Sequence, residues 1–313
     1  MSKLPFLHQA ASALVYLPGR VGNRMRDVIG CLAFLAAFLG TMCGEAYAQE
    51  SAVDASVSAN TSTDLAAAAR GVKRISAHRG ARLDRPENTI AAFERAIEAG
   101  ATAVEIDVRT SQDGKLVIMH DAKVDRTTNA SGRINDLTWA ELAVLDAGSW
   151  FGANYASERI PSLDQVLQVC RGRIGIHLDL KEEGEEYADR VVASVKAYGE
   201  PTRTTAAVRT VEQARQLQKR MPEMKTLIFL RKKEQLDSFL EANVNYVRPQ
   251  IAWIVKDPTL LTKIREGGAK IHLDATTGTP ESILPLLKYR PESLLCDDPE
   301  RLVKTLAQLQ AKD

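Results

Sequence analysis

Short apolar segments alternate with amphipathic segments from Lys73 to the end of this 313-residue chain. The apolar segments have the length and composition of β-strands, and most segments between them have apolar residues at helical spacing. In residues 89–99, for example, Ile90, Phe93 and Ile97 fall on one helical face. Repeated strand–helix units of this size predict a parallel sheet covered by helices.

The number of units favours a closed (β/α)8 TIM barrel, because about 240 residues with eight or so units suit that fold. Nine strands are predicted, at residues 74–78, 103–109, 116–120, 174–181, 205–209, 226–230, 246–251, 270–275 and 293–296. Nine is one too many, and the turn before 116–120 is too short for a crossover helix, so one strand is irregular or wrongly assigned. A doubly wound open sheet is the competing architecture, although no G-x-G-x-x-G loop follows the first strand.

The first 48 residues are predicted to be a secretory signal peptide rather than part of the fold. Residues 28–40 form an apolar run that follows several arginines, and Ala-Tyr-Ala at 46–48 offers a cleavage site. The run is too short for a bilayer, which takes roughly 20 residues. We expect a mature protein that begins at Gln49, has no stable membrane span and lies in the periplasm or outside the cell. A membrane anchor is the alternative.

Two further segments depart from the strand–helix pattern. Residues 49–71 are rich in Ala, Ser and Thr and predict a flexible lead-in, so the folded domain is expected over 72–313. Residues 122–163 contain turn residues and aromatic side chains. We interpret them as a small inserted lobe after the third strand, at the rim of the barrel, that covers the site. A surface excursion without a role in the site is an equal alternative.

The overall charge gives no reason to expect a nucleic-acid partner. Lysines and arginines exceed acidic residues by one, and 26% of the residues are charged. A nucleic-acid-binding protein would show a basic patch or stripe instead. The sequence also lacks zinc-finger spacing and any basic run with interleaved aromatic residues.

Strand alternation places Glu105 and Asp107 on one face of the predicted strand 103–109 and apolar residues on the other. The apolar face suits packing against helices, so the two carboxylates are expected to point into the barrel. Two buried like charges are costly unless a positive group lies between them. Mg²⁺ or Ca²⁺ would meet this need, because both prefer oxygen ligands. Pairing with Arg or Lys is an equal alternative on this strand alone.

The predicted strand 174–181 repeats this pattern, with His177, Asp179 and Lys181 opposite its apolar residues. Asp179 is a candidate third ligand for the same ion. Lys181 lies one layer nearer the C-terminal end of the strand, where the active sites of TIM barrels lie. It is therefore a candidate contact for a phosphate oxygen.

Two more histidines, His78 and His120, end predicted strands. Phosphodiester cleavage needs one group that deprotonates the nucleophile and another that protonates the leaving alkoxide, and histidine does both near neutral pH. Arg79 could clamp a phosphate with two parallel hydrogen bonds. We interpret His177 and His272 as inward-facing polar side chains without a catalytic role.

The order and spacing of several motifs resemble those of the glycerophosphodiester phosphodiesterase family. The motifs are His78-Arg79-Gly80, Pro86-Glu87-Asn88-Thr89, Val104-Glu105-Ile106-Asp107-Val108, His120-Asp121 and Asp179-Leu180-Lys181. The resemblance continues through the insertion, with Asp125-Arg126-Thr127-Thr128-Asn129 and Ile160-Pro161-Ser162-Leu163. It is close from about residue 75 to residue 181 and looser afterwards.

The resemblance implies a TIM barrel with a small inserted lobe. It also implies one divalent metal ion, Mg²⁺ or Ca²⁺, held by Glu105, Asp107 and Asp179. Members of the family usually carry Glu at the position of Asp179, whose shorter side chain leaves room for a water in the metal shell. Many members also have a Trp late in the barrel, near residues 271–274, which is missing here and leaves the alcohol part of the substrate open.

The resemblance assigns the acid and base roles to His78 and His120 and the phosphate contacts to Arg79 and Lys181. Glu87 is expected near the metal or Arg79. The implied reaction is hydrolysis of a small-molecule glycerophosphodiester to glycerol 3-phosphate and an alcohol. The alternatives are a related phosphodiesterase that acts on intact lipids and a non-catalytic binder of phosphate ligands. The sequence does not set the oligomeric state.

Overall fold

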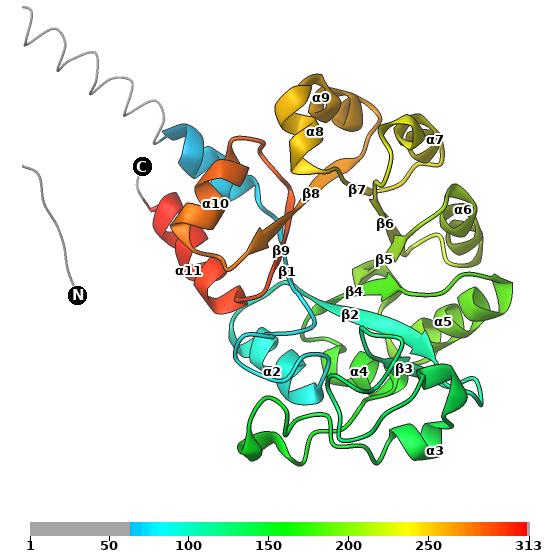
Figure 1. The fold of residues 1–313 in the computed structure, drawn as a ribbon. Coiled ribbons are helices and arrows are strands. Elements are labelled where there is room, and N and C mark those ends of the chain that lie inside the picture. Colours follow the sequence, from blue (N-terminus) through cyan, green and yellow to red (C-terminus); the bar gives the residue numbers. More distant parts are fainter. Residues whose placement is uncertain (1–62, 312–313) are drawn as a thin grey trace, which may run out of the picture. The chain divides into compact units, whose positions relative to one another are not determined.

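Eight parallel strands close into a barrel in this computed structural model, which describes residues 63–311 (Figure 1). They are β1 (Arg74–Ala77), β2 (Ala103–Thr110), β4 (Gly175–Leu180), β5 (Thr204–Val208), β6 (Lys225–Phe229), β7 (Tyr246–Arg248), β8 (Lys270–Thr276) and β9 (Ser293–Cys296). The barrel is closed because β1 pairs with both β2 and β9. The predicted (β/α)8 barrel is confirmed, and the open-sheet alternative is wrong.

The excess strand of the prediction lies outside the barrel. β3 (Leu116–Ile118) pairs antiparallel with the end of β2, where Val108 lies opposite Ile118. A turn of a few residues allows the chain only to fold back as a hairpin, whereas a parallel strand needs a long crossover. This irregular strand explains why the sequence predicts nine strands for a barrel of eight.

Helices surround the barrel in Figure 1. They are α2 (Ile90–Glu98), α4 (Leu163–Cys170), α5 (Glu185–Tyr198), α6 (Val211–Arg220), α7 (Leu236–Glu241), α8 (Ile251–Lys256), α9 (Thr259–Glu266), α10 (Pro280–Leu287) and α11 (Pro299–Gln310). α2 begins where the Thr89 hydroxyl accepts a hydrogen bond from the Ala92 amide. Its Phe93 belongs to the same buried cluster as Val104 and Ile106 of β2, so the apolar face of β2 packs outward as predicted.

One predicted strand is shorter in the structure. The sequence pattern predicts a strand over 246–251, but β7 ends at Arg248 and α8 begins at Ile251. Pro249 lies between them, and its missing amide hydrogen cannot continue the hydrogen-bond ladder of a central strand.

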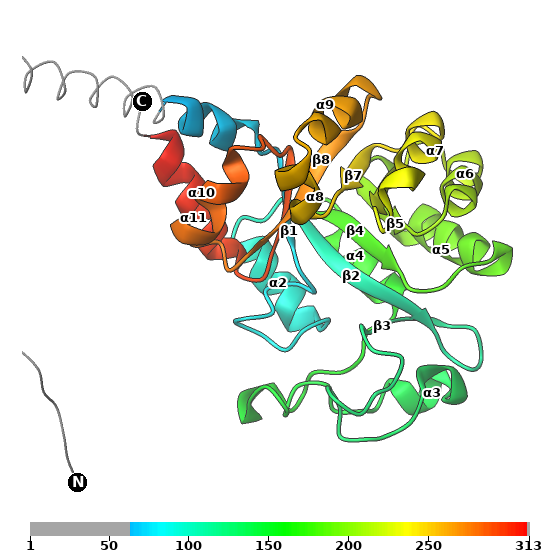
Figure 2. The ribbon, with the colours of Figure 1, turned by 45° about the horizontal axis from the view of Figure 1, so that its top comes forward.

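The chain after β3 forms the predicted lobe, which Figure 2 shows beside α2 and β2. It contains α3 (Trp139–Leu142) and the 3-10 turns η1 (Ile134–Asp136) and η2 (Ala153–Tyr155). The lobe has a small hydrophobic cluster of its own, which includes Leu142 and Ile160. Two further 3-10 turns, η3 (Pro201–Arg203) and η4 (Lys233–Gln235), lie between barrel elements.

The lead-in differs from its prediction at its end. Residues 63–71 are helical rather than flexible. Ala68 and Ala69 in this helix are buried in the main core cluster. Their burial stabilises the helix even though the segment contains few large apolar residues. Residues 1–62, with the predicted signal peptide and the rest of the lead-in, lie outside the described residues. Within the described part of the chain, no helix is both long and apolar enough to cross a membrane.

Candidate active site

Three carboxylates meet inside the barrel as the sequence predicts. Glu105 and Asp107 come from β2, and Asp179 comes from β4, where it is the parallel register partner of Asp107. One oxygen of each lies within 4.8 Å of the others, and all three side chains are buried. Strand alternation therefore places the three carboxylates together, which gives the site three oxygen ligands for one cation.

The turn after β1 carries His78, Arg79 and Gly80 into the same site. Arg79 has a φ of 55°, which is uncommon for a residue with a side chain, and Gly80 has a φ of 81°. A Cβ atom at Gly80 would lie 2.7 Å from Ala92, so only glycine fits. This tight turn directs the Arg79 amide toward Glu105, and its N–H donates to Oε2 at 2.8 Å.

Cationic and amide groups surround the carboxylates. The Lys181 Nζ lies 2.6 Å from Asp107 Oδ1 and also contacts Asp179. Arg209 reaches Asp179 Oδ1 at 3.1 Å, and the Asn88 amide donates to Asp107 Oδ2 at 2.7 Å. Lys181 was predicted to contact phosphate, whereas in the structure it pairs with two of the predicted metal ligands.

The surroundings shift the pKa values of the two β2 carboxylates in opposite directions. Burial raises the pKa of Glu105 well above its usual value, and the nearby charges of Asp107 and Asp179 raise it further. Burial also opposes ionisation of Asp107, but Lys181 and Asn88 outweigh it and lower its pKa. Burial thus favours the neutral form of Glu105, and a cation bound beside it would favour the charged form.

Each predicted catalytic histidine is paired with a carboxylate through its Nδ1. His78 lies 2.6 Å from Asp297 Oδ1, and His120 lies 2.7 Å from Asp121 Oδ1. A carboxylate that accepts a hydrogen bond from Nδ1 fixes the ring orientation and leaves Nε2 for proton transfer. The hydrogen bond from His78 helps to lower the pKa of Asp297 against the effect of burial.

Arg126 of the lobe connects the two sides of the site. Its guanidinium donates to Asp121 Oδ2 at 2.6 Å and to both oxygens of the buried Glu87, at 2.7 and 3.1 Å. Arg79 donates to the same Glu87 carboxylate at 2.9 Å. A chain of hydrogen bonds thus runs from His120 through Asp121, Arg126 and Glu87 to Arg79, and the hydrogen bond from Arg126 lowers the pKa of Asp121 to about 2.

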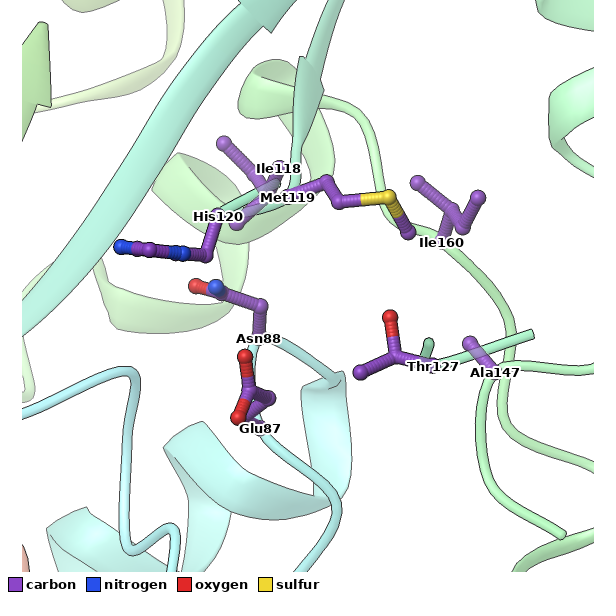
Figure 3. A pocket seen from close by; sticks show the side chains of 8 residues that line it. All are labelled: Glu87, Asn88, Ile118, Met119, His120, Thr127, Ala147 and Ile160. Atoms are coloured by element: carbon purple, nitrogen blue, oxygen red, sulfur yellow. The ribbon is translucent and has the colours of Figure 1, made fainter. Parts of the chain in front are cut away.

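The lobe also forms one wall of a pocket beside His120. Figure 3 shows His120, Asn88 and Glu87 on one side of it and Thr127 and Ala147 of the lobe on the other. The predicted position of Glu87 near Arg79 agrees with the structure. The lobe therefore contributes side chains next to the candidate catalytic residues.

Replacing Arg126 with Ala is expected to lower kcat roughly 10–100-fold, the usual effect of removing a group that orients catalytic side chains. Asp121 and Glu87 would then lose the guanidinium that holds them in place. Arg126→Lys should retain part of the activity, because it keeps the charge but not the bidentate geometry. Steady-state kinetics with a melting curve for each variant checks this. Arg133→Ala is the control, since the Arg133 side chain donates to Asn135 within the lobe. Wild-type kcat in Arg126→Ala would contradict the expectation.

Sequence reasoning gave no role to five residues of this arrangement, which are Asn88, Asp121, Arg126, Arg209 and Asp297. Asp297, the partner of His78, directly follows β9. Active-site residues of TIM barrels lie at the C-terminal ends of the strands, so this position could have indicated a role in the site. Asn88 and Arg126 stand in motifs that were recognised without a role for either residue. Their contacts join segments from different parts of the chain, so spacing alone does not reveal them.

The other two histidines of the barrel do not join the carboxylate site. His177 and His272 are fully buried and make Nδ1 hydrogen bonds to serine hydroxyls. Burial lowers the pKa of His272 to about 3 and that of His177 well below its usual value. Both rings are therefore neutral near pH 7, in agreement with their interpretation as inward-facing polar side chains.

Comparison with known proteins identifies the family. Residues 78–301 match the glycerophosphoryl diester phosphodiesterase family. A glycerophosphodiester phosphodiesterase from Caldanaerobacter subterraneus is 32% identical over 233 residues, which is 72% of this chain and 95% of that protein. The chain belongs to the glycerophosphoryl diester phosphodiesterase family. A Bacillus subtilis glycerophosphodiester phosphodiesterase is 42% identical over a shorter stretch of 109 residues, 32% of this chain and 36% of that protein.

Solved structures show the same barrel. A glycerophosphodiester phosphodiesterase from Agrobacterium tumefaciens has a TM-score of 0.66 and 28% identity, and the match covers 74% of this chain and 99% of that one. A phosphodiesterase from Oleispira antarctica, solved with the product sn-glycerol-3-phosphate, has a TM-score of 0.68 and 26% identity and covers 77% and 99%.

Proposed function

We propose that this protein hydrolyses glycerophosphodiesters to glycerol 3-phosphate and an alcohol with the help of one divalent metal ion. Membership of the family supports the reaction, and a relative that matches 72% of the chain carries that activity in its name. The observation that carries the proposal is the buried carboxylate triad flanked by two histidine–carboxylate pairs. This combination supplies a cation site and two groups for proton transfer.

The residues present fit a hard divalent cation such as Mg²⁺ or Ca²⁺. Glu105, Asp107 and Asp179 offer oxygen ligands, which both ions prefer, and no sulfur or imidazole ligand belongs to this cluster. Burial and the charges of Asp107 and Asp179 raise the pKa of Glu105, and a bound divalent ion would offset both effects. A divalent ion held by these carboxylates would supply positive charge that stabilises the negative charge developing on the phosphate oxygens.

The chain's own residues carry out the proton transfers and the charge stabilisation. One histidine of the pair His78 and His120 removes a proton from the nucleophile, and the other protonates the departing alkoxide. Arg79 keeps a positive charge beside the site, because its Nη1 donates to Glu87 and its Nε lies 3.6 Å from Asp107 Oδ2, and we assign it the contact to a phosphate oxygen. Lys181 keeps a second positive charge beside the reacting phosphate, because it is held by Asp107 and Asp179.

The Asp179 position offers a direct test of its role as a ligand. Asp179→Glu is expected to keep more metal-dependent activity than Asp179→Ala, because it preserves a carboxylate with one extra methylene of reach. Titration calorimetry with Mg²⁺ or Ca²⁺ and steady-state kinetics of both variants measure this. Equal losses of metal affinity in the two variants would mean that Asp179 is not a ligand.

The substrate is tested with a panel of glycerophosphodiesters that differ in the alcohol, alongside intact phospholipids in vesicles, each with Mg²⁺ or Ca²⁺. We expect glycerol 3-phosphate from at least one glycerophosphodiester and little product from the intact lipids. Cleavage of the intact lipids alone would favour a phospholipase-like enzyme. Binding of the diesters without turnover, at any metal concentration, would favour a non-catalytic binder.

We also propose export across the inner membrane, with action on deacylated lipid headgroups in the periplasm or outside the cell. The support is the 13-residue apolar run and the Ala-Tyr-Ala sequence that follows it. N-terminal sequencing of the protein from its native host is expected to give Gln49 as the first residue. An intact Met1 or Met25 on a membrane-bound form would show that the segment is an anchor.

A further inference from the structure

A buried arginine inside the barrel has no acidic partner among the described residues. Arg74 on β1 is 9% exposed. Its Nη2 donates weakly to the carbonyl of Ile176 at 3.4 Å, its guanidinium lies 5.6 Å from the Tyr246 ring centre, and its Nη1 has no partner. Burial lowers its pKa to about 10, so it remains charged near pH 7. Buried charges are usually paired with an opposite charge, because an unpaired one is costly.

Two imidazoles beside it also have an unused nitrogen. His177 on β4 and His272 on β8 each keep Nδ1 on a serine hydroxyl, Ser76 at 3.1 Å and Ser293 at 2.7 Å. Their Nε2 atoms are buried without a partner. The hydroxyls of Ser76 and Ser293 show no other acceptor in the described structure, so each is satisfied when it donates to Nδ1. The proton of each neutral ring then lies on Nε2.

The three side chains face one another across the inside of the barrel. The two rings meet edge to face with centroids 5.5 Å apart. Arg74 and His272 flank Ser293, because the register pairs Ser293 with both of them. Three side chains with one net positive charge therefore lie together inside the barrel, and each keeps a buried nitrogen that has no partner among the described residues.

We propose that Arg74, His177 and His272 bind one small inorganic anion of the halide class inside the barrel. A halide accepts several hydrogen bonds and supplies the missing negative charge. A water molecule would supply no charge, and its own hydrogens would need acceptors. The unpartnered buried side-chain atoms of the described residues include one acceptor, Asn88 Oδ1, and that residue belongs to the carboxylate site. The anion would lie next to the carboxylate triad, since His177 is the register partner of Glu105.

Crystals grown in sodium bromide test the site directly. An anomalous difference map is expected to show bromide within about 3.5 Å of Arg74 Nη1 and of both Nε2 atoms, a distance that suits a halide accepting from N–H groups. A peak that is absent there, or density that fits only water, would overturn the proposal. This experiment uses the wild-type protein and does not depend on the folding of any variant.

Thermal melting in solution gives a second measurement. The melting temperature of the wild type is expected to rise by roughly 2–5 °C for each tenfold increase in chloride or bromide above the dissociation constant, at constant ionic strength set with gluconate. Arg74→Met should lose this dependence, whereas Arg133→Met, a surface control, should keep it. A bromide peak without any halide dependence of the wild type would mean an adventitious ion only and would overturn the proposal. An unchanged dependence in Arg74→Met would do the same.

Discussion

Thorough removal of divalent cations with a chelator is expected to abolish turnover, and addition of Mg²⁺ or Ca²⁺ to restore it. The three carboxylates are buried and close together, and burial and the charges of Asp107 and Asp179 raise the pKa of Glu105. Without the metal, the developing charge on the phosphate would lie beside this acidic cluster. The loss should therefore exceed that caused by any single change outside the site.

The measurement is an activity assay before and after chelation, with back-titration by each ion. A melting curve of the chelated protein serves as the control, because it separates loss of the metal from loss of the fold. Full activity of a chelated protein, with metal content verified by elemental analysis, would contradict a role for the triad as a metal site.

Replacing either paired histidine is expected to lower kcat by about 10²–10⁴-fold, the usual contribution of a placed acid or base. A carboxylate holds Nδ1 of His78 and of His120, which leaves Nε2 of each ring for proton transfer. Alanine removes this nitrogen, and the remaining Asp297 or Asp121 cannot take over its role. His78→Ala and His120→Ala should keep the melting behaviour of a folded protein, because both side chains are partly exposed.

The buried histidines provide the matched comparison. His272→Ala should reduce kcat by less than either change above, since its ring contacts Ser293 and not the carboxylate triad. Single-turnover kinetics of the four proteins compares the chemical step itself. A His120→Ala enzyme with near-normal kcat would remove His120 from the mechanism.

Local patterns predicted the architecture and the central carboxylates. Glu105 and Asp107 could be placed together because side chains alternate along a strand, and Asp179 because a parallel neighbour repeats the same pattern. The strand–helix alternation predicted the barrel, but the short turn before β3 made one strand ambiguous. Pairing partners decide whether such a strand enters the barrel, and pairing is not a local property.

The contacts that orient the site were beyond local reasoning. Asp297 lies 219 positions from His78, and Arg126 lies 39 positions from Glu87. Closure of the barrel and docking of the lobe bring these pairs together, so no periodicity in the sequence marks them. The ion pairs of Lys181 with Asp107 and Asp179 were likewise not predicted, because they form only once the two strands are adjacent.

Phosphorus-31 NMR of a glycerophosphodiester incubated with the metal-loaded protein tests the central claim most directly. The account predicts that the phosphodiester signal disappears and that of glycerol 3-phosphate replaces it. The same sample without divalent metal should keep the diester signal. A diester that stays intact with the folded, metal-loaded protein, across the panel of alcohols, would contradict the account.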